Sequence, residues 1–152
     1  LATCENMDAA GYNELVNFQS GLLGLSETSS SMEELLKHEA EDDRAKDAIE
    51  LFCYQVKKSI GGLAAALGGL DTLVFTGGMG ENAPQVRARI CQGLEFLGIT
   101  IDASRNAAHD EIISADSGRV KVRVIHTDES VTIARDTWQL VNKQGNGHEN
   151  QQ

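Results

Sequence analysis

Apolar residues recur at three- and four-residue spacing over residues 45–67, which predicts one long amphipathic helix. Asp42-Asp43 precedes this stretch, where carboxylates complement the positive end of a helix, and Gly68-Gly69 follows it as a typical helix end. Gly61-Gly62 interrupts the helix at a cost of about 1 kcal/mol per glycine. This pair predicts that another backbone approaches the helix closely there.

Shorter helices are expected before the long one. Residues 1–18 mix polar and apolar positions and predict a short helix, and residues 20–26 form an apolar patch between glycines. The serines at 29–31 are good N-caps, and Glu33 or Glu34 completes a capping box. This pattern predicts a further helix that extends to about residue 40.

A continuous apolar run at residues 72–76 is typical of a strand buried in a parallel sheet. The run leads directly into Gly77-Gly78-Met79-Gly80-Glu81-Asn82. We expect Asn82 to cap the next helix, with Pro84 in the first turn, where its missing N–H does no harm. The apolar positions of that helix continue to residue 97, and Gly98 ends it.

The next part of the chain predicts two more strands. Residues 99–101 form a short apolar strand, and the polar residues 103–119 are expected to form an excursion at the edge of the sheet. Valines alternate with Lys121 and Arg123 over residues 120–124, so this strand has one solvated face, as an edge strand does.

The chain is expected to end in a helix and a tail. Thr127 or Asp128 caps the helix, and residues 143–152 form a flexible polar tail. The apolar positions of this helix are Val131, Ile133, Ala134, Trp138 and Val141. The complete order of helices separating apolar strands predicts an α/β layer architecture. Three strands are few for a sheet covered on both faces, so we expect part of the domain to be missing.

The composition narrows the class of protein. The chain has 152 residues, of which 41% are hydrophobic and 24% charged, as suits one globular domain or part of a larger one. Its net charge of −10 argues against nucleic acid or an anionic membrane as a partner. The chain has no apolar run of about 20 residues, its first residues show no signal-peptide pattern, and its cysteines are scattered. These features predict a cytoplasmic location, reduced thiols and no metal cage. The start at Leu1, within a polar segment, predicts a piece of a longer protein.

The glycines after the first strand suggest a phosphate site. Glycines let an anion approach backbone N–H groups at a helix start, where the helix dipole stabilises its charge. Gly77, Gly78 and Gly80 fit this description, although a plain turn with positive φ fits their spacing equally well. The Walker loop is excluded, because its spacing and its lysine are missing.

A dinucleotide-binding turn fits the same residues more closely. Gly78-x-Gly80-x-x-Ala83 follows a strand, and Asp102 lies nineteen residues further on. Glu81 argues against this interpretation, because a carboxylate inside the turn would repel a pyrophosphate unless a metal ion intervened.

Several blocks of sequence resemble the acetate/propionate kinase family. Residues 73–82 are similar to the family's VFTGGIGEN block. Further similar blocks lie in the family's order at 20–24, 64–69, 86–89, 93–99, 124–129 and 133–137. The resemblance spans nearly everything from residue 12 to 142. It identifies residues 1–142 as the C-terminal nucleotide-binding part of an acetate kinase, before the tail at 143–152.

The resemblance implies a fold and a reaction. The fold is α/β, the C-terminal part of an actin/hexokinase/Hsp70-like (ribonuclease H-like) phosphotransferase domain. The reaction is reversible transfer of a phosphoryl group from ATP to acetate, giving acetyl phosphate and ADP, with Mg²⁺. The family dimerises through this half, so a homodimer is expected.

The resemblance also assigns site residues. It implies that Gly78, Met79, Gly80, Glu81 and Asn82 form the ATP-contacting loop. It further implies that Glu129 is associated with magnesium, although Glu129 by itself could simply complement a helix N-terminus.

Some positions depart from the family pattern. Ser31 and Glu33 occupy the segment where the family carries a nucleotide-contacting Asp and Arg, so adenosine binding is expected to be altered, with helix capping as the alternative role. His126 replaces a proline, and Ser130 replaces a second glutamate.

The family's catalytic residues would all lie before Leu1, so we expect none in this chain. Acetate or propionate would be bound by the missing N-terminal half, and the chain alone should not turn over, because phosphoryl transfer needs both halves. The alternatives are a non-catalytic nucleotide-binding or dimerisation domain and an NAD-binding oxidoreductase domain.

Overall fold

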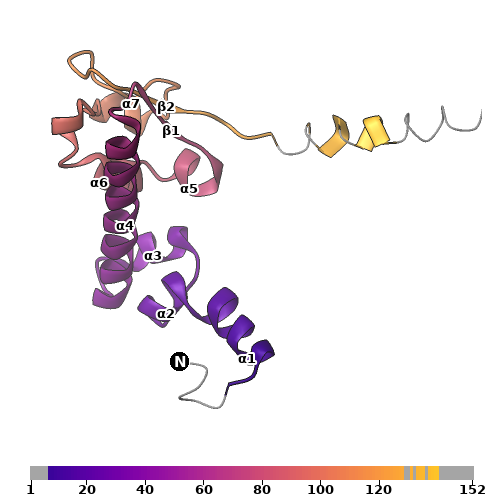
Figure 1. Cartoon of the computed structure of the whole chain (residues 1–152). Coiled ribbons are helices and arrows are strands. Elements are labelled where there is room, and N and C mark those ends of the chain that lie inside the picture. The colour runs from indigo at the N-terminus through magenta and orange to yellow at the C-terminus, as the bar shows by residue number, and fades with distance from the viewer. Residues whose placement is uncertain (1–6, 129–130, 132, 136, 141–152) are drawn as a thin grey trace, which may run out of the picture.

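The computed structural model describes residues 7–128, 131, 133–135 and 137–140 (Figure 1). The helical elements are α1 (Ala9–Glu14), the π-helical turn η1 (Leu15–Gln19), α2 (Gly21–Ser26), α3 (Met32–His38), α4 (Asp43–Leu67), α5 (Gly77–Asn82), α6 (Pro84–Cys91), the 3₁₀ turn η2 (Glu95–Leu97) and α7 (Ala103–Ala107). The strands are β1 (Thr72–Phe75) and β2 (Lys121–Val124).

The predicted long helix is confirmed as α4, and α2, α3 and α6 pack against it (Figure 1). The Asp42 carboxylate caps its start by accepting a hydrogen bond from the Arg44 N–H at 2.9 Å, and Gly68 ends it in the left-handed conformation at φ +75°. The predicted backbone approach at Gly61-Gly62 is wrong for the described residues. A Cβ at either glycine would meet no atom within 4 Å.

Of the helices before α4, a short one within residues 1–18 and α3 were predicted, whereas α2 was not. Helices α2 and α3 pack against α4, and the apolar patch at residues 20–26 folds as α2. Ser31 caps α3 by accepting a hydrogen bond from the Glu34 N–H at 3.5 Å. The apolar side of α3 buries Met32 and Leu35 in the core.

The sheet has two parallel strands within the described part of the chain, with Thr72 opposite Lys121 and Phe75 opposite Val124. The alternation predicted for β2 is confirmed, because Val122 and Val124 are buried while Lys121 is exposed. The predicted strand at 99–101 is wrong: one antiparallel bridge joins Ile101 to Ser114.

The sequence predicts that β1 is buried and that β2 lies at the edge of the sheet, and the structure shows the reverse. The backbone of residues 111–113 covers the second edge of β2, with the Ile113 N–H donating to the Val122 carbonyl at 2.9 Å. Strand β2 is therefore not an edge strand. Strand β1 pairs on one side only among the described residues, and Val74 is 44% exposed, so β1 is not the buried strand that its sequence suggests.

The single helix predicted from Asn82 to Gly98 is wrong. The glycine run is itself helical as α5, so Asn82 ends that helix instead of capping the next one. Helix α6 starts at Pro84, as predicted, and it ends at Cys91. Gln92 already leaves the helical conformation with a ψ of 125°, and Gly93 follows with a φ of +81°, which an α-helix does not allow.

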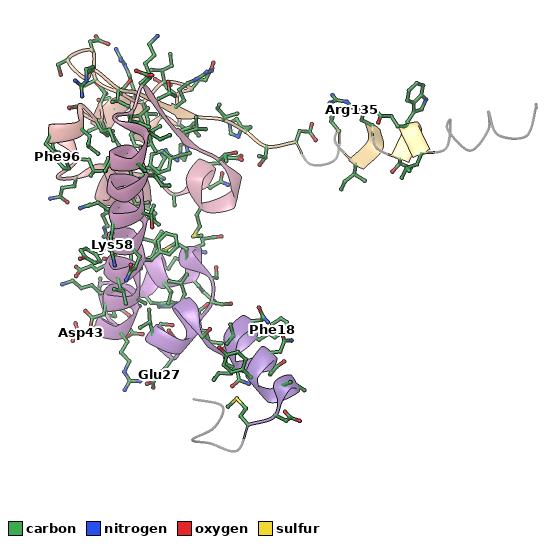
Figure 2. The ribbon with its side chains drawn as sticks, in the orientation of Figure 1. Phe18, Glu27, Asp43, Lys58, Phe96 and Arg135 are labelled. Atoms are coloured by element: carbon green, nitrogen blue, oxygen red, sulfur yellow. The ribbon has the colours of Figure 1, made fainter. Side chains whose placement is uncertain are left out.

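The core lies between α4, α6, the sheet and the loops that join them. Its fully buried apolar side chains include Leu35, Ile49, Ile99, Ile113, Val120 and Val122. Cys53 and Cys91 are buried free thiols, and burial raises the pKa of Cys91 to about 12, while Cys4 lies outside the described residues. Other large apolar side chains project into solvent, among them Phe18 and Phe96 (Figure 2). No helix among the described residues combines the length and apolar character needed to cross a membrane.

The predicted last helix is confirmed for the residues that are described between 131 and 140. Asp128 caps it, because its carboxylate accepts a hydrogen bond from the Val131 N–H at 3.1 Å. Glu129, Ser130, Val141 and the predicted tail at 143–152 lie outside the described residues.

Candidate functional site

Helix α5 leaves the carboxyl end of β1 and carries the glycines that the sequence singles out. Gly77 has a φ of +71°, which disfavours any residue with a side chain. A Cβ at Gly80 would lie 3.2 Å from the carbonyl carbon of Phe75, so β1 and α5 approach closely there. A Cβ at Gly78 would meet nothing within 4 Å, because Gly78 borders open space.

Gly78 lines a groove between α3 and α5. The cavity volume of this groove is about 600 Å³. The residues that line it are Ser31, Met32, Glu33, Leu36, Gly78, Met79, Asn82 and Ala83. The structure thus brings together two segments that are about 45 residues apart in sequence and that the resemblance assigns separately to nucleotide contact.

The α3 wall of the groove combines capping with open polar groups. Ser31 and Glu33 both line the groove while taking part in local helix interactions. Ser31 caps α3, and Glu33 forms an exposed ion pair with Lys37 at 2.6 Å. That pair lowers the pKa of Glu33 through the hydrogen bond and the charge of Lys37. Capping is therefore confirmed for Ser31, whereas nucleotide contact stays a prediction for both residues.

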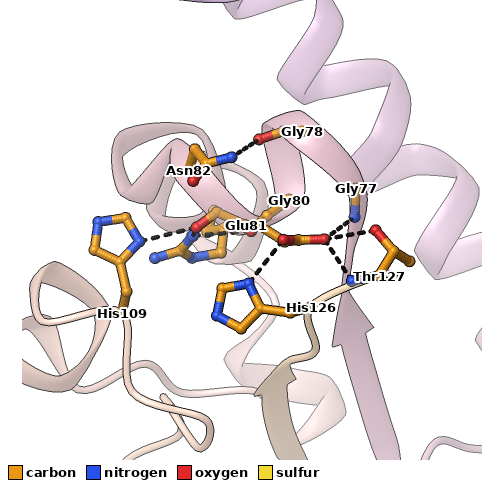
Figure 3. A network of polar contacts seen from close by, with 9 residues as sticks. Gly77, Gly78, Gly80, Glu81, Asn82, His109, His126 and Thr127 are labelled. Atoms are coloured by element: carbon orange, nitrogen blue, oxygen red, sulfur yellow. Dashed lines mark hydrogen bonds and ion pairs between the residues drawn. The ribbon is translucent and has the colours of Figure 1, made fainter. Parts of the chain in front are cut away.

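The Glu81 side chain does not line this groove. Its carboxylate accepts hydrogen bonds from the Gly77 N–H at 2.8 Å, the Thr127 N–H at 3.0 Å and the Thr127 hydroxyl at 2.8 Å (Figure 3). The second carboxylate oxygen lies 2.8 Å from His126 Nδ1. These donors, the Thr127 N–H foremost, lower the pKa of Glu81 to about 2. We call this group of contacts among Glu81, Gly77, His126 and Thr127 the Glu81 clasp.

Arg87 holds the other end of α5. Its guanidinium is fully buried and donates to the carbonyls of Gly80 and Glu81, both at 2.8 Å. It also donates to the side-chain and backbone oxygens of Asn106 at 2.8 Å. Burial lowers the pKa of Arg87, and the ring of carbonyl oxygens offsets that cost.

His109 adds a further contact to the same end of the helix. Its Nδ1 lies 2.9 Å from the Glu81 carbonyl oxygen (Figure 3), and its backbone has a φ of +58°. Sequence reasoning did not identify Arg87, Asn106 or His109 as part of the site. One available signal was that Arg87 follows Val86 directly and falls on the buried side of a helix, where a charge needs partners.

Mg²⁺, which the resemblance implies, would need oxygen ligands at this site. Among the described residues no three His, Cys, Asp or Glu side chains could hold a metal ion together. Mg²⁺ in phosphate sites often needs only one or two carboxylates, since phosphate and water oxygens complete its shell. Glu81 is already occupied by protein donors, and Glu129 lies outside the described residues. The part of the chain that the structure describes therefore offers no complete set of protein ligands for Mg²⁺.

Comparison with known proteins matches the chain to one family. The model of the Acetokinase family matches residues 1–135. An acetate kinase of Solibacter usitatus is 46% identical over 146 residues, and one of Phocaeicola vulgatus is 46% identical over 142 residues. These alignments cover 93% and 91% of this chain but 35% and 36% of the relatives. The chain thus spans about a third of the length of the relatives it matches.

Solved structures agree with the sequence matches. The crystal structure of an acetate kinase from Porphyromonas gingivalis superposes with a TM-score of 0.83 at 40% identity, covering 93% of this chain and 36% of that one. A propionate kinase from Francisella tularensis gives a TM-score of 0.80 at 34% identity, covering 88% of this chain and 34% of that one. The predicted α/β fold of the actin/hexokinase type is confirmed for the part that the chain covers.

We expect Arg87→Met to destabilise the chain by roughly 3 kcal/mol, because the buried carbonyls of Gly80 and Glu81 would lose a charged donor. Arg44→Met is the matched control. Arg44 pairs with Glu27 on the surface, and such pairs contribute about 1 kcal/mol or less. Urea unfolding of both variants measures the difference, and equal losses would contradict the role given to Arg87.

The Glu81 clasp predicts a specific loss of stability in acid. The folded-state pKa of Glu81 is about 2 against its ordinary value of 4.5, so the contribution of Glu81 is complete above about pH 4.5 and disappears as the pH falls to about 2. The gap in melting temperature between wild type and Glu81→Gln should therefore narrow over this range. Carboxyl ¹³C NMR should give a Glu81 midpoint near the lower value, and a midpoint near 4.5 would refute the clasp.

Proposed function

Because this chain belongs to the Acetokinase family, we propose that it binds ATP or ADP in the groove between α3 and α5. In a longer protein it would supply the nucleotide half for reversible phosphoryl transfer between ATP and acetate. The observation that carries this proposal is the groove itself, in which Ser31 and Glu33 face Gly78, Met79 and Asn82.

The groove has the mixed lining that nucleotide sites use. Met32, Leu36 and Met79 supply apolar surface for a base, while the Ser31 hydroxyl and the Asn82 amide supply polar groups for a ribose. Glu33 makes the α3 wall acidic, so we place the phosphates toward Gly78 on the opposite wall. There the missing side chain leaves room for close approach to the backbone.

Magnesium belongs to the same proposal. When bound, Mg²⁺ would neutralise negative charge on the phosphates of the nucleotide. We propose Glu129 as its carboxylate ligand, on the strength of the family resemblance and of its position just after the Glu81 clasp in sequence. Since the net charge of the chain is −10, a cation would also offset repulsion between the protein and the nucleotide.

We propose that the remaining steps depend on the part of the family that this chain does not span. Acetate or propionate would be bound and aligned there, and this chain alone should not turn over. We also propose that the chain forms a homodimer. The exposed side chains of Tyr54, Leu63 and Leu67 on α4 offer apolar surface for that contact.

The dinucleotide-binding alternative is not supported by the geometry. That fingerprint requires the glycine turn to open a long helix, whereas α5 ends at Asn82 and a new helix starts at Pro84. Asp102, the candidate ribose ligand, instead caps α7 by accepting a hydrogen bond from the Arg105 N–H at 2.9 Å.

Titration of the chain with Mg·ATP tests binding at the groove. Gly78→Val should weaken the affinity by about tenfold or more, equal to at least roughly 1.4 kcal/mol, because the new side chain enters the open space. Gly62→Val is the matched control, since it also adds a side chain in open space but on α4, outside the groove. Isothermal titration calorimetry gives both affinities, and equal values for the two variants would place the nucleotide elsewhere.

Enzyme activity is tested in the full-length protein that carries this chain. Incubation with acetate, ATP and Mg²⁺ should yield an acyl phosphate that hydroxylamine traps. Glu129→Ala should reduce the rate on the order of a hundredfold if it holds the metal. An unchanged rate would refute the metal role of Glu129. Absence of acyl phosphate from folded protein that still binds Mg·ATP would favour a non-catalytic nucleotide-binding domain.

A further inference from the structure

We propose that Glu81 is a positioning residue that locks α5 to the segment after β2 and thereby fixes one wall of the nucleotide groove, without touching the nucleotide. This inference rests on the proposed function, because it assumes that the groove binds a nucleotide. It changes the role that the sequence suggests for Glu81, from a member of the ATP-contacting loop to the residue that holds that loop in place.

The position of the Glu81 carboxylate supports a purely internal role. It accepts hydrogen bonds from the two ends of the clasp, Gly77 and Thr127, and its side chain is only 12% exposed. The ring of His126, on the outer side, is 75% exposed. The contact to Gly77 is thus half-buried, whereas the contacts to Thr127 and His126 lie at the surface.

The groove lies on a different side of α5. Gly78, Met79 and Asn82 line it, whereas Gly77 and Glu81 do not. The Asn82 side-chain amide donates a hydrogen bond to the Gly78 carbonyl at 3.0 Å (Figure 3), and both residues line the groove. A substitution within the clasp can therefore change the groove only by moving α5.

Helix α5 needs such an external tie. It has six residues, three of them glycine, and a short glycine-rich helix is unstable in water by itself. The Glu81 clasp holds its first residue, Gly77, while Arg87 holds the carbonyls at its other end. Thr127 is moreover two residues before Glu129, so the same carboxylate fixes the start of the segment that carries the proposed metal ligand.

Substitution of Thr127 distinguishes a positioning role of Glu81 from direct contact between Glu81 and the nucleotide. If Glu81 contacted the nucleotide directly, Glu81→Gln would weaken binding more than Thr127→Val, because Thr127 only holds the carboxylate. If Glu81 positions α5, then Thr127→Val should reproduce the effect of Glu81→Gln, because it removes the hydroxyl donor from the clasp while lying outside the groove. The double variant should then lose little more than either single variant.

The experiment measures Mg·ATP affinity by calorimetry for the wild type, Glu81→Gln, Thr127→Val and their combination. We expect each single variant to bind Mg·ATP about tenfold more weakly than the wild type. The double variant should bind at most about twentyfold more weakly, well short of the roughly hundredfold loss of two independent effects, and Thr127→Ser should bind as the wild type does. Glu95→Gln is the matched control, because Glu95 also accepts a backbone N–H, from Gly93 at 3.1 Å, but lies outside the groove. Circular dichroism and amide exchange in α4 verify that each variant is folded.

Each outcome decides the inference. Weakening by Glu81→Gln but not by Thr127→Val would overturn it in favour of direct contact. Unchanged affinity in both variants would overturn it in favour of a role in folding alone. If the folded wild type does not bind Mg·ATP at all, the proposed function itself fails, and the inference falls with it.

Discussion

The backbone hydrogen bonds of α5 depend on two charged side chains at its opposite ends. The Glu81 carboxylate accepts from the first N–H of the helix, and the Arg87 guanidinium donates to carbonyls near its last turn. An anion at the N-terminal end and a cation at the C-terminal end both complement the helix dipole. A six-residue helix with three glycines could not keep its shape without them, and the groove wall is made of that helix.

The same interaction resolves the apparent conflict of a carboxylate inside the proposed phosphate-binding turn. A free Glu81 would repel phosphate, and only a metal ion was expected to prevent this. In the structure, donors from Gly77, Thr127 and His126 surround the carboxylate, on a side of α5 that does not line the groove. Its charge is therefore balanced within the protein and need not face the nucleotide.

Strand β1 carries an apolar side chain that is exposed where a parallel sheet is normally covered on both faces. This side chain is that of Val74, which is 44% exposed. The relatives are about three times as long as this chain, so they contain much more protein with which to cover such surfaces.

The sequence alone determined the local structure wherever one segment carries the whole signal. The amphipathic spacing and caps of α4, the Ser31 cap of α3, the alternation in β2 and Pro84 at the start of α6 all follow from neighbouring residues. The glycine block and the blocks around it likewise indicated the family, because their order along the chain can be recognised without knowing which residues are in contact. Tertiary structure alone decided which residues meet. Whether β1 or β2 is the open strand, where the Glu81 carboxylate points, and which carbonyls Arg87 satisfies depend on segments distant in sequence. A buried charge is placed by partners that no local pattern reveals.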